Sequence, residues 1–188
     1  MLELGCGPGR YASMLKGIGC SVIAVDPHEF VDWTILRQAG GIEFHSGVFA
    51  EDLPFEDNEF DSVVCFGTLL YVKDVQKSLS EMGRVLKPGG RIALRTVNVG
   101  NSYTRRTGSR IDPASNHLFT KEGLCGELRS AGFELRDCFG FGFFPPFLPA
   151  TYWFATAVLL PKKIIEFLDN ITSEERKHNW IIHAHKPM

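Results

Sequence analysis

The stretch Leu2-Glu3-Leu4-Gly5-Cys6-Gly7-Pro8-Gly9 decides the fold, because it reads as a short buried strand that runs directly into a glycine-rich loop. Apolar residues then recur at helical spacing from Tyr11 to Ile18, and Gly19 ends that predicted helix. The next apolar run, Ser21 to Val25, is typical of a strand buried on both faces, and it ends at Asp26. The order strand, glycine loop, helix, strand predicts a parallel α/β sheet.

The same alternation continues through the first half of the chain. An acidic loop, Phe49 to Glu59, separates two of the predicted strands. Alternating strands and helices predict a doubly wound sheet with right-handed crossovers. We expect helices over Phe30 to Gln38 and over a face made by Val75, Leu79, Met82 and Leu86, and strands over Ile42 to His45, Asp61 to Phe66 and Arg91 to Val97.

The second half of the chain is less regular. A polar stretch over residues 98–118 reads as a long loop or lid, and Thr120 suits the N-cap of a helix that Gly132 would end. We expect one domain over residues 1–188, with residues 1–97 as the ligand-binding half and residues 98–188 as the substrate side. A strand over Phe133 to Phe139, a helix over Tyr152 to about Asn170 and a last strand over Asn179 to His185 complete the prediction.

Composition excludes several classes of protein. The formal net charge is −2, which argues against a general nucleic-acid binder, because such a protein needs an excess of Lys and Arg. Five cysteines without CxxC spacing fit neither a disulfide framework nor a metal site such as zinc. No signal peptide opens the chain, so we expect a cytoplasmic protein with reduced thiols. Because the first strand is short, we also expect that an upstream helix and the front of that strand are missing.

An apolar segment, residues 138–161, contains no charged residue and has the length of a membrane span. Glycines and prolines interrupt it, however, and the uninterrupted remainder from Ala150 to Leu160 is too short to cross a bilayer. We therefore expect no transmembrane span, and peripheral membrane contact stays open as an alternative.

The glycine loop and Asp26 together predict an adenosine-containing ligand. Glycines let the backbone approach a ligand closely, and the helix that follows offers free N–H groups. An acid at the end of the second strand suits ribose hydroxyls. A dinucleotide fingerprint would need glycine where this chain has Arg10, and the Glu3 carboxylate would repel a pyrophosphate. A cationic ligand is therefore favoured over NAD.

These segments resemble the class I S-adenosylmethionine-dependent methyltransferases of the type 11 kind. Leu2 to Gly9 looks like their motif I, Ala50 to Phe55 and Phe60 to Val64 are similar to their fourth-strand region, and Leu86 to Gly90 resembles the turn before their fifth strand. The resemblance covers about Met1 to Thr96. It implies a Rossmann-like, doubly wound, mostly parallel seven-stranded sheet with helices on both faces. The antiparallel C-terminal strand of that fold would be Trp180 to His185.

The resemblance also implies which residues hold the cofactor, S-adenosyl-L-methionine. Glu3 and the backbone of Gly5, Cys6, Gly7 and Gly9 would bind its methionine end. Asp26 would accept hydrogen bonds from both ribose hydroxyls. The turn from Phe49 through Ala50 to Glu51 would border the adenine, and Cys65 and Phe66 would lie beneath the cofactor near the transferred methyl group.

The sequence departs from the family at two places. Many relatives have Asp where this chain has Phe49, so adenine contacts would rely on backbone and packing. Relatives often carry a His pair where this chain has Leu70 and Tyr71, so no histidine role transfers there.

Simpler structural roles stay open for several of these residues. Asp26 could cap the following helix, Glu51 could be an exposed charge of the acidic loop, and Phe66 could be a core residue. We interpret Cys6 and Cys65 as packing residues, because no nearby cation would activate a thiol.

Methyl transfer needs a general base only if the acceptor must lose a proton, so an obvious catalytic dyad is not required. Tyr71, after the fourth strand, and His117, at the end of the polar loop, are the candidates for such a base. Wall or capping roles are the alternative for both.

Two features of the second half indicate the acceptor. Arg105, Arg106 and Arg110 could hold an anionic group, and the aromatic segment from Phe139 to Phe154 could line an apolar pocket. We expect methyl transfer to an O, N or C atom of a small, apolar or lipid-like acceptor rather than DNA, and protein, RNA and sugar acceptors stay open as alternatives. A catalytically inactive cofactor-binding domain or partner subunit is the first alternative, and an NAD-dependent oxidoreductase is the second.

Overall fold

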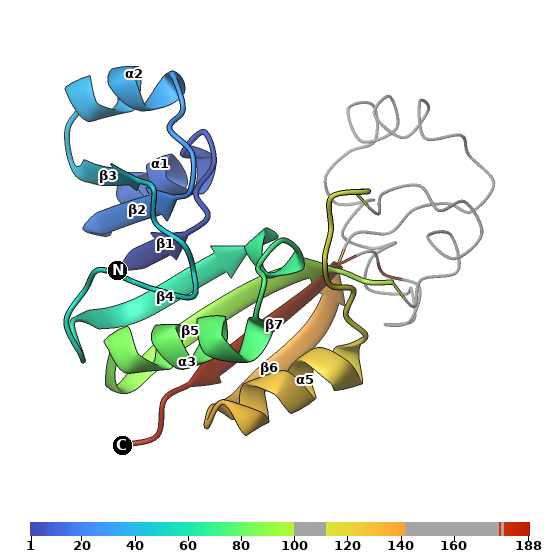
Figure 1. Cartoon of the computed structure of the whole chain (residues 1–188). Coiled ribbons are helices and arrows are strands. Elements are labelled where there is room, and N and C mark those ends of the chain that lie inside the picture. Colours follow the sequence, from blue (N-terminus) through green and yellow to red (C-terminus); the bar gives the residue numbers. More distant parts are fainter. Residues whose placement is uncertain (100–111, 142–176, 178) are drawn as a thin grey trace, which may run out of the picture.

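The computed structural model describes residues 1–99, 112–141, 177 and 179–188, and these contain seven strands (Figure 1). The strands are β1 (Leu2–Leu4), β2 (Val22–Asp26), β3 (Ile42–Ser46), β4 (Phe60–Phe66), β5 (Leu86–Val97), β6 (Glu134–Phe141) and β7 (Asn179–His185). The helices are α1 (Arg10–Gly17), α2 (Asp32–Gln38), α3 (Val75–Val85) and α5 (Lys121–Ser130), with a 3₁₀-helix, η1 (Thr68–Leu70).

All seven strands belong to one sheet in the order β3-β2-β1-β4-β5-β7-β6. The pairs from β3 to β5 are parallel, and β7 runs antiparallel to both of its neighbours, β5 and β6. The order reverses beside β1, and ligands of such sheets bind at the carboxyl ends of the strands near that point. The predicted Rossmann-like sheet with an antiparallel C-terminal strand is confirmed.

Helices cover both faces of the sheet, as predicted. On one face, α1 and α2 pack over Val22, Ala24 and Phe44. On the other face, α3 and α5 pack over alternating residues of the longer strands, such as Ile92 and Leu94 of β5. Because strand side chains alternate between faces, Leu2 and Leu4 point toward the α3 side and Glu3 points toward α1. A carboxyl group is thus placed inside the sheet–helix interface.

Val75, Leu79 and Met82 of the predicted helix face are buried in α3 as expected, but Leu86, the fourth residue predicted for that face, lies beyond the helix and begins β5. The N-cap of α5 is also as predicted, with the Thr120 hydroxyl accepting a hydrogen bond from the Gly123 N–H at 3.1 Å. The prediction for α1 was partly wrong. Met14 and Ile18 are exposed, because the helix turns its Ala12 side toward the sheet.

Several element boundaries differ from the prediction, and two of these differences have clear reasons. The fifth strand starts at Leu86 rather than Arg91, since Leu86 pairs with Phe60 before the register shifts and Arg91 pairs with Ser62. The turn at residues 87–90 is therefore an irregularity within β5. The helix predicted from Phe30 begins at Asp32, because Phe30 lies in the connection and packs against Trp33. The helix predicted over Tyr152 to Asn170 lies outside the described residues.

Candidate functional site

The glycine loop after β1 is held in conformations that favour glycine. Gly5, Gly7 and Gly9 have φ angles of 70°, 51° and 82°. The N–H groups of Gly5 and Cys6 both donate to the Val25 carbonyl, at 2.8 and 3.0 Å. A Cβ atom on Gly5 would lie 1.9 Å from the Thr68 hydroxyl oxygen, so glycine is required there for space as well as for φ.

Asp26 holds this loop from the end of β2. Its carboxylate accepts a hydrogen bond from the Gly7 N–H at 2.9 Å and one from the His28 N–H at 3.0 Å. The Gly7 carbonyl in turn accepts from the Trp33 indole N–H at 2.7 Å. Because Asp26 is only 8% exposed, the carboxylate is fixed beside the loop, with remaining lone pairs for a ligand.

Glu3 is the most deeply buried acid of this region, with 2% exposure. Burial raises its pKa to about 7, a backbone hydrogen bond from Ala12 opposes that rise, and the nearby charge of Asp26 adds to it. Its Oε2 atom has no hydrogen-bond partner among the described residues. A buried carboxyl group with an unused oxygen suits a cationic ligand, whose charge would favour the ionised form.

Two adjoining cavities lie at the carboxyl ends of the strands. The main cavity has a volume of about 580 Å³, and its lining includes Gly5, Asp26, Phe66, Arg95 and Asn179. The side cavity, of about 200 Å³, contains Phe49, Ala50 and Glu51 in its wall. Both share the lining residues Gly5, Pro27, His28, Thr68 and Tyr71.

The predicted cofactor residues therefore fall into two groups. Five of them line one of the two cavities: Gly5, Asp26, Ala50, Glu51 and Phe66. The other five, Glu3, Cys6, Gly7, Gly9 and Cys65, belong to the same loop and strands but are not in either described lining.

The acidic loop that carries Ala50 and Glu51 is held from α3 and the turn before it. Glu51 accepts hydrogen bonds from the N–H groups of Lys73 at 2.6 Å and Asp74 at 3.3 Å. Glu51 is thus a hydrogen-bond acceptor at the wall of the side cavity. It is not the freely exposed charge of the acidic loop that was the simpler alternative.

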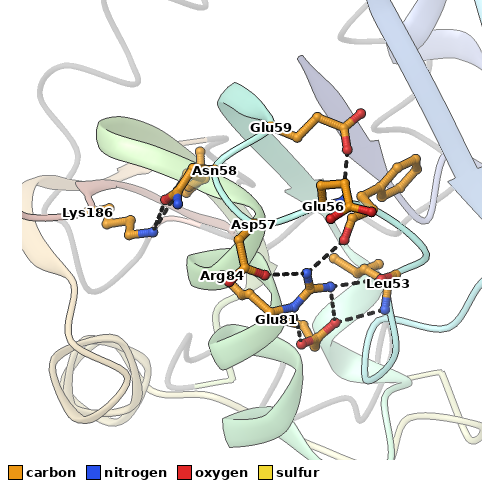
Figure 2. Close-up of polar contacts among 10 residues, drawn as sticks. Leu53, Glu56, Asp57, Asn58, Glu59, Glu81, Arg84 and Lys186 are labelled. Carbon is orange, nitrogen blue, oxygen red and sulfur yellow. Dashed lines mark hydrogen bonds and ion pairs between the residues drawn. The ribbon is translucent and has the colours of Figure 1, made fainter.

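Arg84 of α3 holds the same loop through hydrogen bonds and ion pairs of its guanidinium, as Figure 2 shows. Its guanidinium donates to the carbonyls of Leu53 at 2.8 Å and Phe55 at 2.7 Å. It also forms ion pairs with Glu81 at 2.8 Å and Asp57 at 2.9 Å. Hydrogen bonds from Arg84 lower the pKa of Glu81. The sequence analysis missed this residue, because nothing in its spacing distinguishes it from an exposed helical arginine.

The two candidate bases lie in different places. Tyr71 lines both cavities, and its hydroxyl donates to Asp112 at 3.0 Å. Burial, followed by this contact with Asp112, raises the pKa of Tyr71, which makes its phenolate less available as a base. His117 lines a separate cavity at the N-terminal ends of α3 and α5, and its Nε2 lies 2.9 Å from the Val72 carbonyl.

The cysteines are free thiols, and Cys6 and Cys65 are buried. Burial raises the pKa of Cys65 to about 12 and also raises the pKa of Cys6, with the charges of Glu3 and Asp26 adding to the rise at Cys6. These thiols stay protonated near neutral pH, so neither is an activated nucleophile.

Arg95 was not identified from the sequence, although it lies in the wall of the main cavity. Its guanidinium donates to the Tyr11 hydroxyl and to the Asn179 side-chain oxygen, each at 3.2 Å. A signal was present, because an arginine at the carboxyl end of a buried parallel strand stands where such sheets bind ligands. The earlier candidates Arg105, Arg106 and Arg110 lie outside the described residues.

No group of three or more His, Cys, Asp or Glu side chains among the described residues could hold a metal ion. Within the same ranges, none of the helices has the length and apolar character that a membrane crossing needs.

Comparison with known proteins bears directly on this site. A family model described as a methyltransferase domain matches residues 2–94. The chain is 29% identical over 140 residues to a probable S-adenosylmethionine-dependent methyltransferase of Mycolicibacterium smegmatis. The aligned region makes up 74% of this chain and 54% of that protein. It is 26% identical over 194 residues to a tRNA U34 carboxymethyltransferase of Methylococcus capsulatus. The aligned region makes up 96% of this chain and 51% of that protein. The chain thus spans about half the length of these curated relatives.

Solved structures show the same architecture. An S-adenosylmethionine-dependent methyltransferase from Thermotoga maritima, described as a possible histamine N-methyltransferase, superposes with a TM-score of 0.71 at 25% identity, covering 98% of this chain and 80% of that one. A [4+2]-cyclase superposes with a TM-score of 0.71 at 24% identity, covering 100% of this chain and 74% of that one. The second likeness shows the fold alone.

Proposed function

Because this chain belongs to the class I S-adenosylmethionine-dependent methyltransferases, we propose that it binds S-adenosyl-L-methionine at the glycine loop. We further propose that it moves the methyl group to an O, N or C atom of a small acceptor in the main cavity. The observation that carries the proposal is the pair of buried carboxyl groups, Glu3 and Asp26, beside a loop whose glycines have positive φ.

The chemistry of these residues fits the cofactor. Its methionine end carries an ammonium group and a sulfonium, and Glu3 offers a buried carboxyl oxygen without a partner among the described residues. Asp26 keeps acceptor capacity for ribose hydroxyls at the border of the main cavity. Ala50 and Glu51 stand in the side cavity, where an adenine ring would meet backbone and apolar wall rather than the Asp of many relatives.

The residues of this chain would act mainly by positioning. When bound, the cofactor supplies a methyl group already activated by its sulfonium. Phe66 and Leu70 in the main cavity would exclude water and hold the acceptor in line. Asp26 would keep the glycine loop in its binding conformation through Gly7. Tyr71, one of the two candidate bases, lines the main cavity, and we propose only a wall role for it because its pKa is raised.

The acceptor is proposed to be a small molecule. A relative named for tRNA modification shows that larger acceptors occur among similar proteins. The net charge of −2 and a cavity of about 580 Å³ favour a small molecule over a nucleic acid here. A single domain over residues 1–188 and a cytoplasmic location remain predictions.

An inactive cofactor-binding domain is the second candidate. Phe49 stands where many relatives have Asp, and the likeness to a [4+2]-cyclase shows that this fold is not restricted to methyl transfer. Binding of the cofactor without turnover on any acceptor would favour this candidate. An NAD-dependent oxidoreductase is disfavoured by the Glu3 carboxyl group beside the loop.

Isothermal titration tests the cofactor site. We expect micromolar binding of S-adenosylmethionine and of its demethylated product, and no binding of NAD. Asp26→Ala should weaken binding about a hundredfold, since hydrogen bonds to a charged group are worth about 1.5–3 kcal/mol. Asp61→Ala is the matched control, because that carboxylate is 79% exposed and pairs only with Lys87 among the described residues. Binding of NAD, or equal affinities in the two variants, would overturn the proposal.

A further inference from the structure

We propose that Phe49 stacks on the purine base of the cofactor, and that the site therefore binds the adenosine and inosine forms of the cofactor alike. This inference rests on the proposed function and deepens it, since it states how the side cavity recognises the base.

Phe49 presents an exposed aromatic ring in the wall of the side cavity. Its side chain is 52% exposed. Four apolar neighbours in the same lining are buried, with exposures of 8% or less: Leu4, Val48, Ala50 and Val72. An aromatic ring that lies open in a concave, largely apolar wall is suited to be covered by a flat ligand group.

The backbone fixes Phe49 beside the proposed ribose site. The Val48 N–H donates to the Asp26 carbonyl at 3.3 Å, so the residue before Phe49 is joined to the end of β2. The Phe49 carbonyl accepts a hydrogen bond from the Asp52 N–H at 3.2 Å, which closes a tight turn after it. Asp26 borders the main cavity and is proposed to hold the ribose. A base attached to that ribose would therefore lie in the adjoining side cavity, which Phe49 lines.

Three polar side chains of the side cavity already form hydrogen bonds within the protein. The Glu51 carboxylate accepts from two backbone N–H groups of the turn before α3. The Thr68 hydroxyl donates to a carbonyl at the end of β1 at 3.1 Å, and the Tyr71 hydroxyl donates to a carboxylate at 3.0 Å. These groups are oriented by the fold itself, so their directions are not set by the edge of a base.

His28 and Lys73 are the remaining polar side chains of the described lining, and both are exposed. A hydrogen bond from an exposed side chain replaces one to water, so its net contribution to affinity is small. A strong preference between two ligands requires a buried polar group that only one of them satisfies. Stacking depends on the flat face that every base has, whichever group the base carries at its edge. The wall therefore favours a purine without distinguishing an amino group from an oxygen at its 6-position.

The experiment compares two probes by isothermal titration into the full chain. One is the demethylated cofactor product, S-adenosylhomocysteine, and the other is its inosine counterpart, S-inosylhomocysteine. We expect their dissociation constants in the wild type to agree within about fivefold, which corresponds to about 1 kcal/mol. Phe49→Ala should weaken both probes about tenfold or more, by the usual contribution of one base stacked on an aromatic side chain.

The chain contains a matched control for Phe49. Phe139 of β6 is also an exposed aromatic residue, with 40% exposure, and it lies in neither described cavity lining. Phe139→Ala should bind both probes as the wild type does. Thermal unfolding of the two alanine variants shows whether either substitution perturbs the fold.

Two conservative variants separate the ring from its apolar area. Phe49→Tyr keeps the ring and should bind both probes as the wild type does. Phe49→Leu keeps an apolar side chain without a ring, and it should lose most of the affinity that Phe49→Ala loses.

The inference is overturned if the wild type prefers S-adenosylhomocysteine over its inosine counterpart by more than about tenfold. It is also overturned if Phe49→Ala and Phe139→Ala bind the probes alike. Failure of both probes to bind the wild type would instead count against the proposed function.

Discussion

Two loops border the proposed cofactor cleft, and they are held in place by different means. The glycine loop, Gly5–Gly9, relies on left-handed backbone angles, close packing against Thr68 and the buried carboxylate of Asp26. The acidic loop, Phe49–Glu59, relies on side chains of α3, chiefly the partly exposed Arg84 (Figure 2). Both loops place residues at the cavities, so the same cleft combines a rigid wall with a wall that depends on a few polar contacts.

The difference predicts how each loop responds to substitution. In the glycine loop, Gly5 combines a positive φ with close packing against Thr68, so a single methyl group there is costly. A partly exposed network exchanges hydrogen bonds with water when a partner is removed, so its loss is smaller. The expected effects of substitutions in and beside the two loops run from the largest to the smallest as follows.

Gly5→Ala should have the largest effect. It combines a φ of 70° with a Cβ atom 1.9 Å from the Thr68 hydroxyl, so we expect the free energy of unfolding to fall by about 4 kcal/mol. Gly19→Ala is the control, because its φ is 94° but nothing lies within 4 Å of its Cβ position. That control should lose about 1 kcal/mol in urea denaturation. Equal losses would show that packing against Thr68 does not constrain the loop.

Glu3→Gln should show a pH-dependent gain. The pKa of Glu3 is raised from 4.5 in the unfolded chain to about 7 in the folded protein, so the folded state binds the proton more tightly. Its contribution to stability is fully present below pH 4.5 and is lost as pH rises toward 7. Glu3→Gln should therefore be more stable than the wild type by about 3 kcal/mol at pH 8, and equal to it at pH 4.

The same residue gives a binding test. A cationic cofactor favours the ionised carboxylate, so the wild type should release a proton on binding S-adenosylmethionine near pH 6. Titrations in buffers of different ionisation enthalpy measure that release, and Glu3→Gln should abolish it. Proton release that persists in the variant would remove Glu3 from the cofactor site.

Arg84→Met should have an intermediate effect. It removes hydrogen bonds to Leu53 and Phe55 and the ion pairs with Glu81 and Asp57, but the side chain is 31% exposed. We expect a loss of about 2 kcal/mol in urea denaturation and weaker cofactor binding. Lys87→Met breaks one exposed pair with Asp61 and should change stability by less than about 0.5 kcal/mol. If Lys87→Met lowered the free energy of unfolding as much as Arg84→Met, the contacts of Arg84 would stabilise the protein no more than an exposed ion pair does.

Asn58→Gly should have the smallest effect. Among the described residues, Asn58 is the non-glycine residue with a positive φ angle, 59°. It is exposed within the acidic loop. Glycine keeps that angle and loses only the hydrogen bond from Lys186, so the stability should change by less than about 0.5 kcal/mol. Asn58→Ala should cost about 1 kcal/mol by thermal unfolding. A larger loss from glycine would show that the contact with Lys186 supports the loop.

The sequence predicted the glycine-loop side of the cleft well, because its structure depends on local patterns. Glycines at Gly5, Gly7 and Gly9 and an acid at Asp26 have fixed spacings that a reader of the chain can recognise. The mostly parallel sheet and its antiparallel C-terminal strand followed from the family resemblance.

The remaining features depend on contacts between distant segments. Arg84 reaches Leu53 and Phe55 across about 30 positions of the chain, and Arg95 meets Tyr11 and Asn179, each 84 positions away. No local spacing encodes such contacts. The exposure of Met14 was also missed, because periodicity gives a helix face but not the rotation of the helix on the sheet.

The place of β7 between β5 and β6 has a consequence for synthesis of the chain. Strands are made in sequence order, yet the strand made last fills the gap between two made earlier. Until residues 179–185 have left the ribosome, β5 and β6 have no common partner, and each presents an unpaired edge. β6 can therefore join the other strands only after residues 179–185 have been made, and the edge of β5 stays open to aggregation until then.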